Sequence, residues 1–462
     1  MNSFDEKIFN KSLWKGAYIV GGSVRDRLLG RTPFDFDVAV FGNAKKFAKH
    51  LAAVKNGHWV EMGKQGQAVY RVVVDKMILD VSPVNGTSIE EDLKRRDFTI
   101  NAMAYDIASK AYIDCVGGMQ DLENQNIRMV SRSIFERDPL RLIRAYRMAA
   151  VFEFTIEPRT LSAVKADAGL ISNTAAERIR TELFKILETS NSHRYILQMA
   201  DSGLLFVILP ELSSLKGCTQ NRYHRFDIFD HTIKAFFHLE NILKNPVAYF
   251  PVLGNLQDKW AQKDRAELLK YCVLLHDIGK PAVKTEDRQG RIHFYGHGKK
   301  SADMAKRINQ RLKLSNQAAE YTDFIIRNHI RPLFLFNAHQ QKNISSKAII
   351  RFFMKCGSRT PDLWLHTLAD IKGKGDAEDE RNAAFIEFAR KMITYYHSEY
   401  QSKKERPPLI SGKDLINTFG LKPSPLFKKI LTRVEEARLS DSIHSKAEAE
   451  AWVRDFLARS KE

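Results

Sequence analysis

Apolar and polar residues alternate near the start of the chain as they do in β-strands. The pattern predicts an apolar strand over residues 17–20, a break at Gly21-Gly22, a short helix capped by Ser23 and a second strand over residues 35–40. A helix that begins directly after a glycine pair exposes backbone N–H groups and the positive end of its dipole, and both attract phosphate. Arg25 adds a full positive charge at the same place. This stretch therefore predicts a phosphate site between two strands.

Two carboxylates share one face of the second strand. Phe36, Val38 and Val40 alternate with Asp35 and Asp37, so the apolar side chains face the core and the acids face away from it. The acids repel each other unless a cation lies between them. Oxygen ligands at this spacing suit Mg²⁺, which takes one or two carboxylates together with substrate phosphates. An isolated Asp-x-Asp is more often a solvated strand face, so the phosphate site beside it decides the interpretation.

The rest of the chain divides into a mixed part and a helical part. Periodicity predicts an amphipathic helix over 45–54, a hairpin over 68–81, an apolar helix that includes Ile100, Met103 and Ala104, and a strand and turn over 112–118. From about residue 126 helical spacing dominates. Asp80 lies in the apolar second strand of the hairpin, where it either meets a cation or is an outward-facing acid at the sheet edge. The fold class expected is α+β, an α/β head followed by all-α regions.

One helix of the second part begins with a charged cluster. Asp138 before Pro139 is typical of an N-cap with proline in the first turn, and Arg141 and Arg144 follow at helical spacing on the same face. An Asp138–Arg141 pair would offer an acceptor and a fork of donors, enough to bond the edges of C and A. The later helix over 175–187 has apolar residues at helical spacing, and we interpret it as core.

Nine of the fourteen histidines fall between His224 and His366. Histidines with acids in helical segments indicate a metal site. The most specific motif is the adjacent pair His276-Asp277, and His231 and Asp370 are the expected flanking ligands. His297 and His329 could extend the site to a second metal. We expect His224, His293, His339 and His366 to be surface or core histidines.

Composition favours a nucleic-acid partner in a reducing compartment. Lys and Arg outnumber Asp and Glu by 73 to 55, which gives a net charge of +18 and a pI near 9.5. Such a balance favours an acidic polymer, although a merely basic enzyme would have it too. The four cysteines are far apart and form no Cys-x-x-Cys, so neither a disulfide framework nor a zinc ribbon is expected. With no signal peptide or membrane-length apolar run, we expect a cytoplasmic protein.

The head motifs together resemble those of the class II tRNA nucleotidyltransferases, the family of CCA-adding enzymes and bacterial poly(A) polymerases. The resemblance rests on three segments: YIVGGSVRDRLLGRTPFDFD from Tyr18, EEDLKRRDFTINAMAYD from Glu90 and the helix start FERDPLR. The resemblance implies a polymerase-β-like nucleotidyltransferase head with two metal ions on Asp35 and Asp37, and a third carboxylate at Asp80. It also implies nucleotide contacts for the following residues: Gly21, Gly22, Arg25, Arg96, Asp97, Asn101, Asp138, Arg141 and Arg144. Arg137 stands where the family has Glu, which leaves the base preference open.

The histidine segments resemble the HD domain of metal-dependent phosphohydrolases, which also occurs in some bacterial CCA-adding enzymes. The resemblance implies a divalent transition metal on His231, His276, Asp277 and Asp370. We therefore expect four parts: a nucleotidyltransferase head over residues 1–125, a helical neck and body for base selection and RNA binding over 126–220, an HD domain over 221–375 and a helical tail over 376–462. Lys413, Lys428 and Lys429 in the tail could meet an RNA backbone or form a solvated helix face.

The predicted function is template-independent, Mg²⁺-dependent addition of C or A from CTP and ATP to the 3′ end of tRNA. Addition of CC is favoured over full CCA, because only SPVNGTSI separates Val81 from Glu90, where the full CCA-adding enzymes carry a longer loop. Three alternatives remain: a poly(A) polymerase, an HD phosphohydrolase whose head only recognises RNA, and an inert RNA-binding protein.

Overall fold

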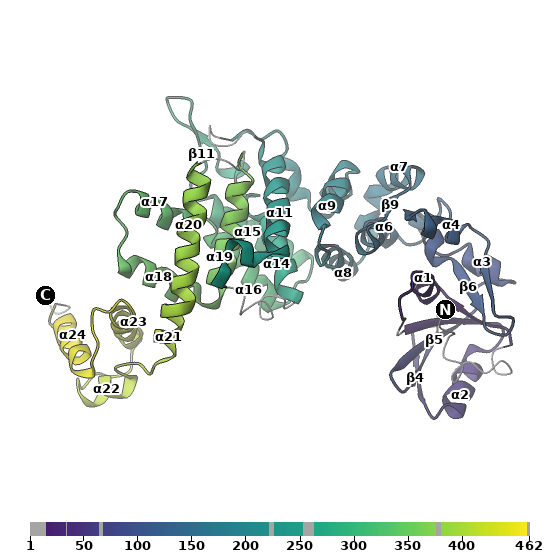
Figure 1. The fold of residues 1–462 in the computed structure, drawn as a ribbon, viewed down its shortest axis with the longest axis horizontal. Helices are drawn as coiled ribbons and strands as arrows, with labels where there is room; N and C mark the ends of the chain where they lie inside the picture. The colour runs from purple at the N-terminus through teal and green to yellow at the C-terminus, as the bar shows by residue number, and fades with distance from the viewer. Residues whose placement is uncertain are drawn as a thin grey trace. The chain divides into compact units, whose positions relative to one another are not determined.

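The computed structural model describes residues 15–33, 35–63, 68–220, 226–252, 263–375 and 380–459. The chain folds into two compact units, Met1–Leu209 and Pro210–Glu462 (Figure 1). The first contains a mixed sheet followed by helices, and the second is mostly helical, which confirms the expected fold class. No helix within the described ranges is long and apolar enough to cross a membrane.

A seven-stranded sheet in the order β3-β4-β5-β2-β1-β6-β7 forms the head. Its strands are β1 (Ala17–Val20), β2 (Asp35–Val40), β3 (His58–Met62), β4 (Val69–Val74), β5 (Met77–Pro83), β6 (Met103–Asp106) and β7 (Ala111–Asp114). Neighbours pair antiparallel except β2 and β5, which run parallel. The helices of the head are α1 (Gly22–Leu28), α2 (Ala44–Val54), α3 (Ile89–Leu93) and α4 (Gly118–Glu123), with a 3₁₀ turn η1 (Thr99–Asn101).

The alternation in β2 places its acids as the sequence predicts. Phe36, Val38 and Val40 are buried, whereas Asp35 and Asp37 are exposed. Ala39 shares the face of the two acids, and it packs in an apolar cluster with Ile89 and Leu93 of α3. One end of this face is therefore covered, and the end that carries the acids is open.

Two local predictions for the head are wrong. Ser23 does not cap α1: Gly21 is the N-cap residue at φ 75°, and the Ser23 hydroxyl donates to the Val20 carbonyl at 3.2 Å. The apolar helix expected around Ile100 is instead the turn η1 followed by strand β6. A short apolar run fits a buried strand as well as a helix, and here pairing of β6 with β1 and β7 decides between them.

A helical neck completes the first unit. Its helices are α5 (Ile134–Arg137), α6 (Leu140–Phe152), α7 (Pro158–Asp167), α8 (Ala176–Leu187), α9 (Ser192–Asp201) and α10 (Leu204–Ile208), with η2 (Ala168–Asn173) and the two-residue strands β8 (Asn126–Ile127) and β9 (Thr155–Ile156). Tyr146 of α6 is fully buried, and its hydroxyl donates to Ser202 Oγ at 2.8 Å. Leu183 of α8 is also completely buried. The apolar faces of α6 and α8 thus form the core of the neck.

The second unit begins with a helical bundle. Its longer helices are α11 (Ile228–Lys244), α14 (Lys263–Leu275), α15 (His297–Arg311), α16 (Asn316–Asn328), α17 (Arg331–Gln340), α18 (Ser346–Cys356), α19 (Thr360–Lys372) and α20 (Glu380–Tyr395). Shorter elements are η3 (Pro210–Leu215), α12 (Pro246–Tyr249), η5 (Pro281–Val283), β10 (Thr285–Glu286), β11 (Ile292–His293), η6 (Gly357–Arg359), the π-helix η7 (Tyr396–Tyr400) and α21 (Gln401–Glu405). Trp364 of α19 and Phe236 of α11 are completely buried in its core.

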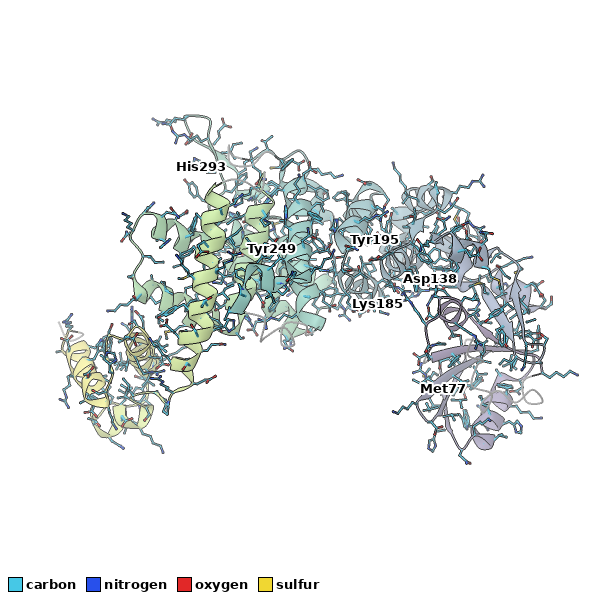
Figure 2. The ribbon with its side chains drawn as sticks, in the orientation of Figure 1. Met77, Asp138, Lys185, Tyr195, Tyr249 and His293 are labelled. Atoms are coloured by element: carbon cyan, nitrogen blue, oxygen red, sulfur yellow. The ribbon has the colours of Figure 1, made fainter. Side chains whose placement is uncertain are left out.

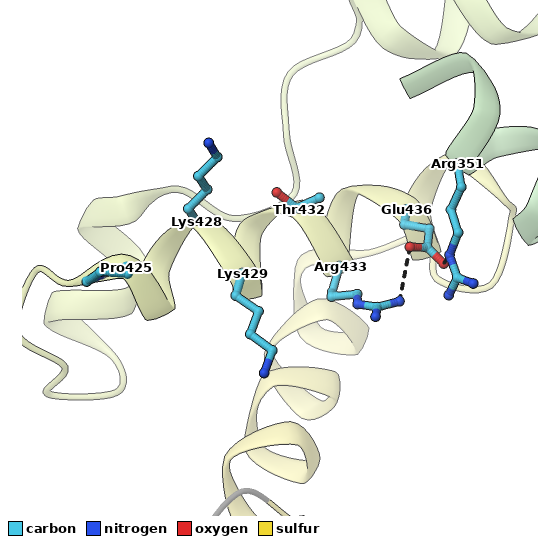
Figure 3. Close-up of a pocket in the computed structure, with 7 residues that line it drawn as sticks. All are labelled: Arg351, Pro425, Lys428, Lys429, Thr432, Arg433 and Glu436. Carbon is cyan, nitrogen blue, oxygen red and sulfur yellow. Dashed lines mark hydrogen bonds and ion pairs between the residues drawn. The ribbon is translucent and has the colours of Figure 1, made fainter. Parts of the chain in front are cut away.

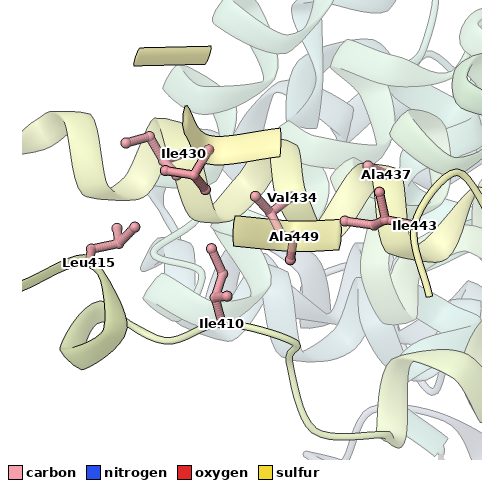
Figure 4. Close-up of a cluster of buried hydrophobic side chains, with 8 residues drawn as sticks. Ile410, Leu415, Ile430, Val434, Ala437, Ile443 and Ala449 are labelled. Atoms are coloured by element: carbon pink, nitrogen blue, oxygen red, sulfur yellow. The ribbon is translucent and has the colours of Figure 1, made fainter. Parts of the chain in front are cut away.

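The last helices have a small core of their own. They are α22 (Gly412–Asn417), α23 (Pro425–Leu439) and α24 (Lys446–Arg459). Figure 4 shows the buried side chains that hold them together: Ile410, Leu415, Ile430, Val434, Ala437, Ile443 and Ala449.

Candidate active site and histidine cluster

Three carboxylates lie on two neighbouring strands of the head. Asp37 of β2 and Asp80 of β5 are Cα partners in the parallel pair, so their side chains emerge next to each other, and Asp35 precedes Asp37 on the same face. Asp80 is also fixed from β4, where the Arg71 guanidinium donates to both of its oxygens at 2.8 Å. The strand register therefore brings together the three acids that the sequence indicates.

The pKa of Asp37 is raised by its surroundings. Although the side chain reaches the surface, the surrounding protein partly desolvates the carboxylate and raises its pKa, Arg96 lowers it, and the neighbouring Asp80 and Asp35 raise it further, so that the pKa lies above its ordinary value. Arg96 and Asp37 converge on Gly21, where a Cβ atom would lie 2.9 Å from Arg96 Nη1 and 3.2 Å from Asp37 Oδ2. Glycine is thus required here both for φ 75° and for the close approach of the two charged groups. Clustered carboxylates fit a hard cation such as Mg²⁺.

A chain of polar contacts links α1 to the neck helix α6. Arg25 Nη1 donates to Asn101 Oδ1 at 2.5 Å, Asn101 Nδ2 donates to Asp97 Oδ1 at 3.1 Å, and Arg144 Nη1 donates to Asp97 Oδ2 at 3.2 Å. Burial would raise the pKa of Asp97, but Arg144 and the hydrogen bonds from Asn101 and the Phe98 N–H outweigh it, and the pKa is lowered. Four residues that the sequence assigns to nucleotide contacts thus form one network.

Helix α8 contributes to this network, although the sequence indicates only a core role for it. Glu182 is buried and contacts both Arg147 and Arg144, the latter at 3.6 Å from Arg144 Nε. A buried carboxylate between two guanidiniums holds the basic face of α6 in place. The sequence signal was present: a polar Glu182 next to the buried Leu183 in an apolar helix requires a partner.

The expected Asp138–Arg141 pair does not form. Asp138 is also not the N-cap of α6, because Pro139 occupies that position without a side-chain capping bond, and Asp138 Oδ1 accepts a hydrogen bond from the Leu140 N–H at 3.3 Å. Its other oxygen pairs with Arg178 of α8 at 3.0 Å. Arg141 instead directs Nη1 to the Ile134 carbonyl at 3.5 Å. The prediction fails because spacing within one helix cannot reveal an arginine that a later helix brings to the same carboxylate.

In the second unit all six histidines and acids of the predicted metal site meet. His231 comes from α11, His276 and Asp277 follow α14, and Asp370 comes from α19; His297 begins α15 and His329 follows α16. His231 Nε2 lies 2.9 Å from Asp370 Oδ1, and His276 Nε2 lies 3.0 Å from Asp277 Oδ2. His297 Nε2 lies 3.6 Å from Asp277 Oδ1 and 3.2 Å from His329 Nε2. Two sets could each hold a cation: His231, His276 and Asp370, and His276, Asp277 and His329.

The ring orientation of three of these histidines fits a metal. His276, His297 and His329 each place Nδ1 within 2.6–2.8 Å of the carbonyl three residues earlier. An Nδ1–H that donates to a carbonyl leaves the lone pair on Nε2, the arrangement usual for metal-ligating histidine. Imidazole together with carboxylate suits Mn²⁺, Co²⁺, Ni²⁺ or Zn²⁺. The buried acids of this site need a positive charge beside them, because an isolated buried charge is costly.

The acids of the histidine cluster lie beside basic groups whose charge they favour. Burial lowers the pKa of His276, but Asp277 and Asp370 outweigh it and raise that pKa to about 9. Lys280 Nζ lies 2.6 Å from Asp277 Oδ2, and Lys374 Nζ lies 3.3 Å from Asp370 Oδ2. Divalent ions would compete with these cations for the same oxygens.

His366 also belongs to the cluster, contrary to the sequence-based expectation. Its ring centroid lies 5.2 Å from that of His276 and 5.5 Å from that of His329, and burial and His276 lower its pKa to about 3. The signal was its spacing: His366 precedes Asp370 by one helical turn. His339 stacks on Phe388, and His293 (labelled in Figure 2) bonds Asp287, both outside the cluster. His224 lies outside the described residues.

A basic groove lies between α18 and α23 (Figure 3). It is lined by Arg351, Pro425, Lys428, Lys429, Thr432, Arg433 and Glu436. Glu436 pairs with Arg351 at 2.8 Å and with Arg433 at 3.4 Å, so one acid balances part of the four cations. The remaining positive charge suits phosphate oxygens. Lys413 is not among the lining residues.

Three family descriptions match the chain. They are the poly A polymerase head domain over residues 17–128, the probable RNA and SrmB-binding site of polymerase A over 153–216, and the HD domain over 228–353. Among solved structures, a Thermotoga maritima CCA-adding enzyme complexed with tRNA is similar in fold, with a TM-score of 0.67 at 21% identity over 99% of this chain and 96% of that one.

Curated relatives match nearly the whole chain. The A-adding tRNA nucleotidyltransferase of Deinococcus radiodurans is 32% identical over 95% of both chains. The CC-adding tRNA nucleotidyltransferase of Thermus thermophilus is 28% identical over 95% of this chain and 93% of its own. The multifunctional CCA protein of Pasteurella multocida is 30% identical over 77% of this chain and 84% of its own. The chain therefore belongs to the tRNA nucleotidyltransferase family.

Proposed function

We propose that this enzyme adds C to the 3′ end of tRNA from CTP and leaves the terminal A to another enzyme. The observation that carries the nucleotidyltransferase reaction is the register of β2 and β5, which aligns Asp37 with Asp80 and places Asp35 on the same face. The proposed substrates are tRNA and CTP, and ATP is the nucleotide of the A-adding and CCA-adding alternatives. The division into head, neck, HD domain and tail, and the cytoplasmic location, stay predictions.

We assign Asp35, Asp37 and Asp80 to hold Mg²⁺. When bound there, Mg²⁺ would supply positive charge that stabilises the transferring phosphoryl group and the leaving pyrophosphate. The backbone N–H group of Gly22, at the start of α1, would face the triphosphate, whereas the Gly21 N–H donates to the Met103 carbonyl at 3.2 Å. Arg96 lies beside both groups, because its guanidinium approaches the Gly21 turn and lowers the pKa of Asp37. Positioning and electrostatics would carry the reaction, without a covalent intermediate.

The network behind this site would orient the sugar and base. Arg25, Asn101 and Asp97 are held in one hydrogen-bonded chain that ends on Arg144. Arg144 is committed to this chain, so base contacts fall to Asp138 and Arg141. Both lie at the start of α6 and offer an acceptor and donors.

Restricted product length is supported by a short connection in the head. Only five residues, 84–88, separate the end of β5 from the start of α3, and a tight link limits rearrangement of the adjoining pocket between C and A. The relatives that match 95% of the chain carry the names CC-adding or A-adding, whereas the multifunctional CCA protein matches 77%. Addition of A alone is the second candidate, because the Deinococcus relative has the higher identity of the two.

The histidine cluster would give a second, separable activity. His231, His276, Asp277 and Asp370, with His297 and His329, would hold one or two transition-metal ions. Their chemistry is that of phosphate ester hydrolysis, in which a bound metal lowers the pKa of water. We further propose that the basic groove between α18 and α23 contacts the phosphate backbone of the RNA.

The test is addition to defined tRNA ends. Purified enzyme is incubated with tRNA that lacks CCA, or that ends in C or CC, and with each labelled nucleotide in turn. Growth of the bare tRNA by two C residues, with no A on the CC-ended tRNA, would support the proposal. A on the CC-ended tRNA alone would favour the A-adding candidate, C and A together would favour ordinary CCA addition, and a long A tail would indicate a poly(A) polymerase.

A further inference from the structure

The carboxylate of Asp138 has both oxygens engaged. Oδ1 accepts the Leu140 N–H at 3.3 Å, and Oδ2 accepts Arg178 Nη2 at 3.0 Å. Arg178 reaches it from α8, forty residues later in the chain. A base amino group that needs this carboxylate must therefore compete with a guanidinium.

Arg141, three residues further along α6, is the guanidinium left to meet a base. Among the residues that the structure describes, no acceptor bonds its buried Nε, and its Nη1 makes only a long contact with the Ile134 carbonyl. Arg144, in contrast, is held by Asp97 and Glu182. Arg141 and Asp138 are thus unequal partners for a nucleotide: the donor is open, and the acceptor is occupied.

An open donor beside an occupied acceptor suits cytosine better than adenine. The Watson–Crick edge of cytosine presents one amino donor and two acceptors, N3 and O2, whereas that of adenine presents one amino donor and one acceptor, N1. A guanidinium fork can satisfy both acceptors of cytosine without help. Adenine depends more heavily on an acceptor for its amino group, and that acceptor is Asp138.

We propose that Arg178 is a positioning residue for base choice: by holding Asp138 it favours cytosine, and its release would admit adenine. The pair can exchange readily, because the Arg178 side chain is 51% exposed and that of Asp138 is 26% exposed. Exposed ion pairs are weak and compete with water. The inference rests on the proposed nucleotide addition to tRNA.

The test compares Arg178→Ala with the wild-type enzyme and with Lys185→Ala, a matched control that removes another exposed cation of the same helix (Lys185 and Asp138 are labelled in Figure 2). We expect Arg178→Ala to raise the ratio of kcat/KM for ATP to that for CTP by about tenfold, the effect of one charge-assisted hydrogen bond. Arg178→Lys retains a cation that can reach Asp138 and should restore most of the wild-type ratio. Lys185→Ala should leave the ratio unchanged.

Equilibrium binding of ATP and CTP without tRNA provides the second readout and should shift in the same direction. An equal loss for both nucleotides in Arg178→Ala, with unchanged preference, would show a merely structural role and overturn the inference. If the alanine variant melts early, Arg178→Gln takes its place with the same expectation. Failure of the wild-type enzyme to add any nucleotide to tRNA would overturn the proposed function and this inference together, whereas wild-type addition with an unaltered ratio in the variants would overturn the inference alone.

Discussion

The two candidate metal sites hold clustered carboxylates close together in opposite ways. Asp35 and Asp37 of the head are exposed on an open strand face, whereas His276 and Asp277 of the second unit are completely buried among helices. In the head, the strand register alone sets the positions of the acids. In the histidine cluster, Nδ1 contacts with backbone carbonyls fix the rings before any ion binds. The first site depends on substrate phosphates to complete it, and the second has its ligand set complete.

The difference also determines which groups stabilise the acids of each site. Water and Arg71 can screen the head carboxylates. The buried Asp277 instead lies against Lys280 and His276, because an unpaired buried charge costs several kcal/mol. A substitution in the head should therefore affect catalysis more than stability, and one in the histidine cluster should affect both.

The largest effect is expected from Asp37→Ala, which should lower incorporation of labelled CMP into tRNA by at least about a hundredfold, as loss of a central electrostatic group does. The melting temperature should stay the same or rise, because the substitution removes repulsion among Asp35, Asp37 and Asp80. Glu61→Ala, which removes an exposed acid of the same sheet, is the control. Wild-type incorporation by Asp37→Ala would exclude the assignment of this carboxylate to the metal.

Asp277→Ala should abolish phosphate ester hydrolysis in the presence of Mn²⁺, Ni²⁺ or Co²⁺ and leave CMP incorporation within about twofold, because the two sites belong to separate compact units and share no residues. His293→Ala, a histidine outside the cluster, should retain both activities. Circular dichroism checks that the variant is folded. A folded Asp277→Ala that loses CMP incorporation would break the separation between the sites, and absence of hydrolysis in the wild-type enzyme would leave the cluster a structural role.

Periodicity predicted the head well where a residue's position depends on its own strand. The buried face of β2 and the exposed Asp35 and Asp37 follow from alternation alone. The adjacency of Asp80 does not, because it needs the parallel pairing of β2 with β5 across some forty residues. The family resemblance supplied Asp80, and the residue pattern by itself left it open.

Side-chain contacts between separate helices could not be predicted from the sequence. Arg178 replaces Arg141 as the partner of Asp138, and Glu182 joins Arg144, because α8 packs on α6 in an orientation that no spacing encodes. His366 was missed for a different reason. Its one-turn spacing from Asp370 was visible, but a buried histidine in an apolar helix is more often core, and only the fold brings it beside His276.

Metal binding should stabilise the histidine cluster more than the carboxylate site of the head. Mn²⁺ at a hundred times its dissociation constant should stabilise the second unit by about 2.7 kcal/mol, since the ion binds a site that exists only in the folded state. Mg²⁺ without nucleotide should stabilise the head less, because its ligand set is incomplete. Differential scanning calorimetry of the wild-type enzyme and of His276→Ala measures both. An equal Mn²⁺ shift in His276→Ala would place the ion elsewhere.

The smallest effect concerns the network between head and neck, and it depends on pH. Because the pKa of Asp97 is lowered in the folded protein, its ionised form contributes stability above the unfolded pKa near 3.9, and that stability is lost as the pH falls through the folded pKa. Asp97→Asn should cost about 1–2 kcal/mol at neutral pH, through loss of the charge-assisted bond from Arg144, and much less in acid. Urea unfolding at neutral pH and in acid, with the exposed turn residue Asp75→Asn as control, measures the difference. If the free energies of unfolding of Asp97→Asn and the wild-type protein change in parallel with pH, the charge of Asp97 does not contribute to the contact with Arg144. The head site would then lack the electrostatic link to α6 that its geometry indicates.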